Sequence, residues 1–211
     1  MKRLLASALA CLAFVACGVS DTLRTGDLLF VAYPPGVVGD GMDQAISAST
    51  GDGKMDFVHA AIVEVEDGEP YVIDATIRYG VHRHHLDTLV KQFTMPDGTA
   101  PVLVFKRLKD DSGAEAFVSR AKEFIGEEYD SCFLPDNGKH YCTELIYDSY
   151  IRDGKRIFSS APMNWKGPDG EYPKYWVDLF AYIGQPIPQG VEGTNPQDMS
   201  GDAALITLNI R

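Results

Sequence analysis

The sequence predicts one domain of the α+β class, built around an antiparallel sheet. The chain has 211 residues, of which 45% are hydrophobic and 23% charged, a composition typical of a globular protein with a sizeable core. Two β-rich runs in residues 57–76 flank Asp67-Gly68, a dipeptide that favours a two-residue hairpin turn. Two later segments, residues 112–125 and 143–151, carry apolar side chains at helical spacing.

The chain begins with an export signal, predicted over residues 1–16, where a positively charged start precedes an apolar run that is short for a membrane span. The run stops at Cys17, and this junction resembles a bacterial lipoprotein cleavage site. We therefore expect a lipid on Cys17, residues 17–24 as a tether and residues 25–211 as the single folded domain. Ordinary signal cleavage without a lipid is the alternative. The expected location is the cell envelope, either periplasmic or associated with the outer membrane.

The net charge of −11 narrows the range of partners. An acidic protein is repelled by nucleic acids and by anionic membrane surfaces, so we expect neither as a partner. The one membrane contact that we expect is the N-terminal lipid anchor.

The remaining elements follow in chain order. Apolar patterning and turn residues predict strands at residues 26–33, 57–66, 69–76, 101–108 and 204–210, and helices at residues 43–49, 112–125, 143–151 and 175–182. Ser112 and Glu115 fit a capping box for the second helix, and Gly126 would end it. Its apolar stripe would consist of Phe117, Ala121, Phe124 and Ile125.

The hairpin turn determines which side chains of its two strands lie together. With two residues in the turn, Val63 pairs with Val72, and side chains alternate between the two faces. His59 and Asp74 are then diagonal neighbours on one face, about 7–8 Å apart at Cα, within reach of a carboxylate–imidazole hydrogen bond. This bond would fix the imidazole tautomer and stabilise its protonated form. A change of one residue in the turn would separate the pair.

Cys142 stands at the start of the predicted helix 143–151. The unpaired N–H groups and partial positive charge of a helix N-terminus stabilise a thiolate and can form an oxyanion hole. A cysteine placed there, together with a histidine oriented by an acid, meets the general requirement for thiol nucleophilic catalysis. The residues alone leave three alternatives open: a nucleophile, a buried core thiol, or a disulfide with Cys132, which an oxidising compartment allows.

Four motifs occur in this order over residues 23–150: "LRTGDLLF", "VHAAIVEVEDG" continuing to "YVIDAT", "GEEYDSCF" and "YCTELIYDSY". They resemble the permuted NlpC-type papain-like cysteine hydrolases of the YiiX-like branch, which is related to the lecithin:retinol acyltransferase group. Papain-like enzymes place the cysteine helix before the histidine strand, whereas here His59 precedes Cys142, as a circular permutation requires. The resemblance implies a permuted papain-like fold, with an antiparallel sheet or small barrel packed on helices.

The resemblance also implies roles for individual residues. Cys142 would be the nucleophile, His59 the base and Asp74 the acid, at a position where the family usually has Glu. Cys142 would attack an amide or ester carbonyl, and water would then hydrolyse the acyl-enzyme. The resemblance implies no cofactor.

Three residues beside these motifs are candidates for substrate binding. Tyr141 and Tyr129 would line the cleft with an aromatic ring and a hydroxyl; the alternative is core packing with a satisfied hydroxyl. Glu144 falls in the first turn of the helix. It would either complement the helix dipole or recognise a substrate amine.

The segment "VHRHH", residues 81–85, holds three histidines. His82 and His84 would share a strand face, but zinc usually requires further ligands and no second cluster is evident. We therefore expect no metal site here and interpret the segment as a solvated loop or a strand edge.

Together these features predict an exported cysteine hydrolase that cleaves amide bonds in cell-wall peptides or small amino-acid amides. The alternatives are a lipid acyl hydrolase or acyltransferase of the same fold, and a catalytically silent binding module. A narrow polar cleft would favour peptides, and a wide apolar groove would favour acyl chains.

Overall fold

The computed structural model describes residues 21–39, 41–52 and 54–210. The predicted signal segment and Cys17 lie outside the described residues. Within these ranges, no helix has both the length and the apolar character needed to cross a membrane. Part of the predicted tether is bound to the domain, because the backbone N–H of Asp21 donates to the carbonyl of Asn209 at 2.9 Å and the carbonyl of Thr22 accepts from Arg107.

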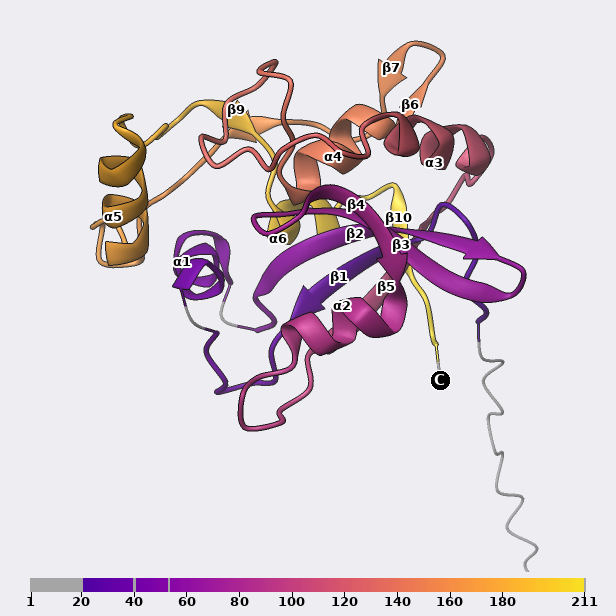
Figure 1. The fold of residues 1–211 in the computed structure, drawn as a ribbon, viewed down its shortest axis with the longest axis horizontal. Coiled ribbons are helices and arrows are strands. Elements are labelled where there is room, and N and C mark those ends of the chain that lie inside the picture. Colours follow the sequence, from indigo (N-terminus) through magenta and orange to yellow (C-terminus); the bar gives the residue numbers. More distant parts are fainter. Residues whose placement is uncertain (1–20, 40, 53, 211) are drawn as a thin grey trace, which may run out of the picture.

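In the described residues, six strands form one antiparallel sheet in the order β10-β5-β1-β2-β3-β4 (Figure 1). The strands are β1 (Leu28–Ala32), β2 (Phe57–Glu66), β3 (Glu69–Thr76), β4 (Gly80–His85), β5 (Val102–Leu108) and β10 (Leu205–Thr207). Two short pairs lie outside this sheet: β6 (Ile151–Arg152) with β7 (Lys155–Arg156), and β8 (Ala161–Pro162) with β9 (Glu192–Gly193). Because β10 and β4 are both edges, the sheet is open and does not close into a barrel.

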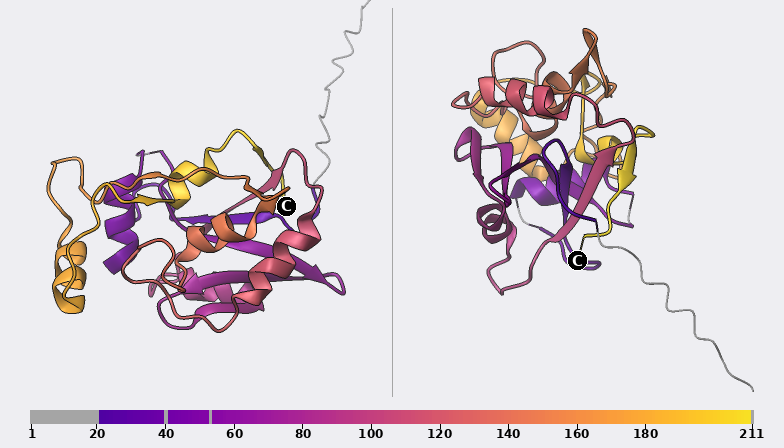
Figure 2. Two further views of the ribbon diagram at one scale, coloured as in Figure 1. Left: turned by 90° about the horizontal axis from the view of Figure 1, so that it is seen from above. Right: turned by 90° about the vertical axis from the view of Figure 1, so that its right-hand side faces the viewer.

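Helices cover both faces of the sheet. Their bounds are α1 (Gly41–Thr50), α2 (Leu86–Phe93), α3 (Ala114–Glu123), α4 (Cys142–Ser149), α5 (Lys174–Ile183) and α6 (Pro196–Ser200). Helices α3 and α4 pack on one face and α2 on the other, while α1 and α5 lie side by side at one end of the molecule (Figures 1 and 2). The sequence did not predict α2, α6 or the short strands β6 to β9, and for β4 it gave two alternatives, a solvated loop or a strand edge.

Strand β1 shows why the centre of the sheet is the core. All five of its side chains are buried, because alternate residues enter two apolar clusters on opposite faces. Leu28 and Phe30 pack with Leu145 and Ile146 of α4, whereas Leu29 packs with the cluster beneath α2. The sheet is therefore held on both sides, and the side chains that it carries have a rigid support.

The hairpin register is confirmed. Asp67 and Gly68 have φ angles of 53° and 83°, the left-handed values that a type I′ turn requires, and Val63 pairs with Val72. The capping box predicted for α3 is wrong. Gly113, in the left-handed region at φ 86°, occupies the N-cap position and makes no side-chain hydrogen bond. The helix begins at Ala114, one residue later than it would if Ser112 were the N-cap. Ile125, predicted to face the core, is exposed.

Candidate active site

The hydrogen bond between His59 and Asp74 that the hairpin register predicted is confirmed. His59 Nε2 lies 2.7 Å from Asp74 Oδ2, and both side chains are buried. The register between β1 and β2 shifts beside His59, leaving Val58 as an extra residue, and such a bulge re-aims neighbouring side chains. The ring of Phe93 packs on the imidazole at a centroid distance of 4.9 Å, so His59 is fixed by a bond and by packing.

Cys142 is the first residue of α4, and Tyr141 in extended conformation is the N-cap. Its backbone N–H is therefore one of the groups without an intrahelical partner. Both Cys142 and Cys132 are free, so the disulfide alternative is wrong. Cys142 is buried, lines the same pocket as His59 and is close enough to raise the pKa of the imidazole. Because His59 Nε2 is bonded to Asp74, Nδ1 is the ring nitrogen left to face the sulfur.

The charges of His59 and Asp74 stabilise each other. Burial would lower the pKa of His59, but hydrogen bonds to Asp74 and Cys142 and the attraction of their negative charges outweigh it and raise this pKa to about 10. Burial would raise the pKa of Asp74, but hydrogen bonds from His59 and His84 hold it below its usual range. An imidazolium at His59, between the carboxylate of Asp74 and the sulfur of Cys142, is the expected state at neutral pH.

Two pockets meet at Cys142. One contains His59 and is bordered by Phe93 and by residues of α1. The other is walled mainly by aromatic and apolar side chains from distant parts of the chain: Phe133, Tyr141, Met163, Trp165 and Trp176. Ile46 and Tyr129 belong to both pockets, so a substrate could present its carbonyl to the sulfur and extend to either side.

Both predicted tyrosines line these pockets. Tyr129 borders both, and its hydroxyl lies 3.6 Å from the sulfur of Met42. Tyr141 lines the aromatic pocket, but its hydroxyl already accepts the backbone N–H of Thr194 at 2.9 Å. The ring of Tyr141 is thus available to a substrate, while its hydroxyl connects α4 to the C-terminal segment.

Glu144 lines neither pocket and is buried in the first turn of α4. Burial raises its pKa to about 8, and the nearby Asp130 adds to the effect. The backbone N–H of Tyr141 partly offsets this rise in pKa by favouring the carboxylate, while Oε2 has no hydrogen-bond partner in the described part of the chain. These contacts favour the helix-cap interpretation over recognition of a substrate amine.

A protein family matches almost the whole described chain. Its description is "Permuted papain-like amidase enzyme, YaeF/YiiX, C92 family", and the match extends over residues 22–209. The chain belongs to this family. It is therefore a cysteine hydrolase of the peptidase or amidase type, as the motifs predicted.

A solved structure supports the fold of this YaeF/YiiX-family amidase. The crystal structure of metalloprotein YiiX from Escherichia coli O157:H7 matches with a TM-score of 0.68 and 21% identity, over 89% of this chain and 97% of that chain. At this identity the likeness shows the fold, and it confirms the permuted papain-like arrangement. No curated protein matches the chain.

Sequence reasoning missed the aromatic wall of this family member's pocket. Phe133, Trp165 and Trp176 pack edge to face, with centroid distances of 4.8–5.7 Å among the three rings. They come from the loop before α4, from the segment after β8 and from α5. The signal available in the sequence was the aromatic content of the tail, which by itself does not indicate where the rings meet.

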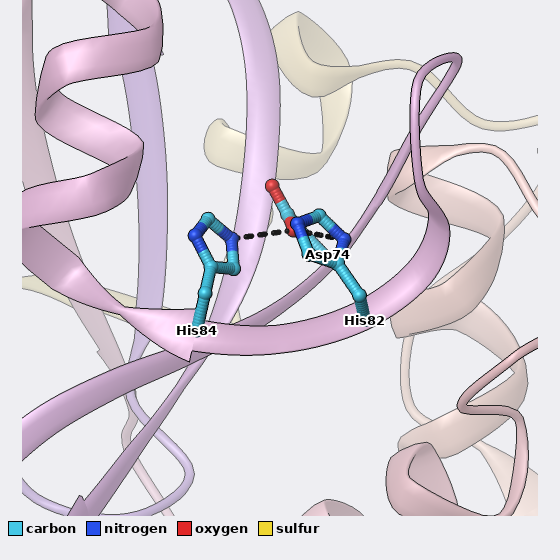
Figure 3. Close-up of side chains that lie close together, drawn as sticks. All are labelled: Asp74, His82 and His84. Atoms are coloured by element: carbon cyan, nitrogen blue, oxygen red, sulfur yellow. Dashed lines mark hydrogen bonds and ion pairs between the residues drawn. The ribbon is translucent and has the colours of Figure 1, made fainter.

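The histidines of "VHRHH" are placed differently from the prediction. They belong to β4, the edge strand of the sheet, so the strand-edge interpretation is confirmed, but His82 and His84 are not solvated. His84 Nε2 lies 2.9 Å from Asp74 Oδ1, and His82 Nδ1 lies 3.4 Å from the same oxygen (Figure 3). Asp74 on the adjacent strand β3 supplies the further ligand group that the sequence did not indicate.

Proposed function

We propose that the protein uses Cys142, His59 and Asp74 to hydrolyse amide bonds in cell-wall peptides or small amino-acid amides. The observation that carries this proposal is the continuous contact from Asp74 through His59 to Cys142 at the N-terminus of α4. Family membership supplies the reaction type. The signal-like segment and Cys17 support export and a lipid anchor, which would place the enzyme beside peptidoglycan.

The geometry supports an acyl-enzyme mechanism. The Cys142 thiolate attacks the amide carbonyl, forming a C–S bond, and the resulting oxyanion accepts a hydrogen bond from the backbone N–H of Cys142. The His59 imidazolium donates its proton to the leaving nitrogen as the C–N bond breaks, which leaves a thioester and a neutral imidazole. His59 then removes a proton from water, the resulting hydroxide attacks the thioester, and Cys142 leaves as the thiolate. Asp74 orients His59 and stabilises its charged form throughout.

The aromatic pocket supports a substrate with an apolar group next to the scissile bond. Its walls bury an apolar side chain favourably, and the polar side chains of Thr194 and Asn195 stand at its border, hydrogen-bonded to Thr143 and Asp198. An amino-acid amide or peptide with an aliphatic or aromatic side chain would match this combination.

The same wall favours a second candidate, a lipid acyl hydrolase or acyltransferase. An acyl chain is apolar along its whole length and would match the pocket walled by Phe133, Trp165 and Trp176. A polar lining of the kind expected for peptides is present only in part. The two candidates share the nucleophile and differ in the substrate, so one assay with two substrate classes separates them.

Two measurements test the proposal. First, iodoacetamide should alkylate Cys142 faster than a model thiol, with Cys132→Ala as the control that leaves the fast reaction in place. Second, purified peptidoglycan fragments, amino-acid amides and fatty-acyl esters are incubated with wild type and with Cys142→Ala. Amide products that disappear in the variant support the proposal. Ester products alone would favour the acyl hydrolase, and a Cys142 that reacts no faster than a model thiol would overturn both.

A further inference from the structure

A cluster of imidazoles surrounds one buried carboxylate. Asp74 of β3 is fully buried and lies between β2 and β4, whose residues reach it from both sides. Its Oδ2 contacts His59, as described, while its Oδ1 contacts His84 at 2.9 Å and His82 at 3.4 Å. Asp74 and His82 are direct cross-strand partners, and His84 is two residues further along the same face of β4 (Figure 3). The sheet itself therefore holds the three side chains together.

The hydrogen bonds of the protein leave this cluster incomplete. His82 Nδ1 has the carbonyl of Gly80 at 3.3 Å as a further neighbour, but His82 Nε2 and His84 Nδ1 are buried without a partner in the described residues. The His84 side chain is only 10% exposed. The two rings are stacked, with centroids 4.2 Å apart and an interplanar angle of 12°. The nitrogens that face Asp74 Oδ1 are His84 Nε2 and His82 Nδ1, while the two nitrogens without a partner are the other nitrogen of each ring.

We propose that Asp74, His82 and His84 bind one divalent transition-metal ion, and that zinc is the ion that this ligand set fits. Each residue offers one ligand atom, and the three atoms lie within 4.8 Å of one another. Two imidazoles and a carboxylate are a ligand set of zinc sites that keep a fourth position for water. Zinc bonds of about 2.0–2.1 Å in a tetrahedral site place neighbouring ligand atoms roughly 3.3 Å apart, close to the separations of Asp74 Oδ1 from the two imidazoles.

The ion would lie on the side of Asp74 opposite to the dyad. Oδ1 would bind the metal while Oδ2 keeps its hydrogen bond to His59, so both contacts can exist together. The His82 side chain is 20% exposed, which gives an ion a route from the surface. A metal held there would fix the carboxylate that orients His59, which makes His82 and His84 positioning residues. The metal site shares Asp74 with the proposed reaction, but zinc binding can be tested without any substrate and does not depend on whether the reaction takes place.

The experiment measures zinc binding in a Cys142→Ser background, which removes the thiolate as a competing ligand. After treatment with a chelator and dialysis, the protein is titrated with Zn²⁺ by calorimetry, and its metal content and melting temperature are determined. We expect one zinc per chain and a higher melting temperature with zinc. His82→Gln/His84→Gln should lose both effects. His85→Gln, on the same strand but outside the cluster, should keep them.

Two further measurements distinguish a loss of zinc binding from misfolding of the variant. The metal-free double variant must unfold cooperatively; the single variant His84→Gln is used in its place if it does not, and should weaken zinc binding at least tenfold. Tetrahedral Co²⁺ bound to the background protein should also give visible absorption that the histidine variants lack. No zinc in the background protein, zinc retained in the histidine variants, or equal zinc loss in His85→Gln would each overturn the assignment.

Discussion

His59 and Asp74 are separated by 15 positions in the chain, yet their side chains meet at 2.7 Å because a two-residue turn aligns β2 with β3. The carboxylate holds the imidazole through Nε2 and leaves Nδ1 for Cys142. This one contact connects the β2–β3 hairpin to Cys142, and the first prediction follows from it.

Replacing His59 or Asp74 should reduce activity, and the loss should be larger for His59. His59→Ala removes the proton donor and acceptor, and we expect an approximately 10²–10⁴-fold lower kcat/KM for amide hydrolysis. Asp74→Asn keeps the shape but loses a charge-assisted hydrogen bond of about 1.5–3 kcal/mol, so a loss of roughly 10- to 150-fold is expected. Steady-state kinetics and the rate of Cys142 alkylation check both. Equal activity of His59→Ala and wild type would contradict the assignment.

The buried Glu144 should make the protein less stable as the pH rises. Its pKa is raised to about 8 in the folded protein, from 4.5, because burial and the nearby Asp130 disfavour the charge. The folded state therefore prefers the protonated form, and this advantage is complete below pH 4.5 and is lost as pH rises through 8.

Glu144→Gln is neutral at every pH and should avoid this loss. Its free energy of unfolding should rise relative to wild type between pH 4.5 and 8, as measured by urea denaturation at several pH values. Glu115→Gln, an exposed change on α3, is the matched control. A pH-independent difference between Glu144→Gln and wild type would count against this account.

Tyr141→Phe should destabilise the protein without touching the nucleophile. The change leaves the buried backbone N–H of Thr194 without its acceptor, at a cost of about 1–3 kcal/mol. Thermal or chemical unfolding measures the loss. Tyr182→Phe, at a side chain that is 89% exposed, should change the stability by less than about 0.5 kcal/mol. If both variants unfold alike, the hydroxyl of Tyr141 has no role in connecting α4 to the C-terminal segment.

Gly80 begins β4 and cannot carry a side chain. It has a φ of 65°, and a Cβ there would lie 2.0 Å from the carbonyl oxygen of Glu127. Gly68→Ala in the hairpin turn has the same backbone strain, about 1–2 kcal/mol, but open space around it. Gly80→Ala should therefore cost clearly more than Gly68→Ala in denaturant unfolding. A similar loss in both variants would mean that the loop at Glu127 moves away freely.

Local rules made much of this fold predictable. Turn chemistry is a property of two adjacent residues, and Asp67-Gly68 adopts the left-handed angles that set the hairpin register. From that register and from the alternation of side chains, the contact between His59 and Asp74 followed. The position of Cys142 at the start of α4 was also readable, because helical periodicity begins directly after it.

The surroundings of these residues could not be predicted in the same way. The β4 strand does not alternate apolar and polar residues, so no local pattern indicates that His82 and His84 are largely buried. These two side chains contact the carboxylate of Asp74 and not an apolar core. The aromatic wall joins Phe133 to Trp165 and Trp176, up to 43 positions away, through contacts that no local pattern records. Local sequence determines backbone conformation and register, whereas a pocket forms only where distant segments pack together. The contact of His59 with Asp74 and the place of Cys142 at the start of α4 could therefore be predicted from local sequence, whereas the shape of the pocket beside Cys142 depends on the folded whole.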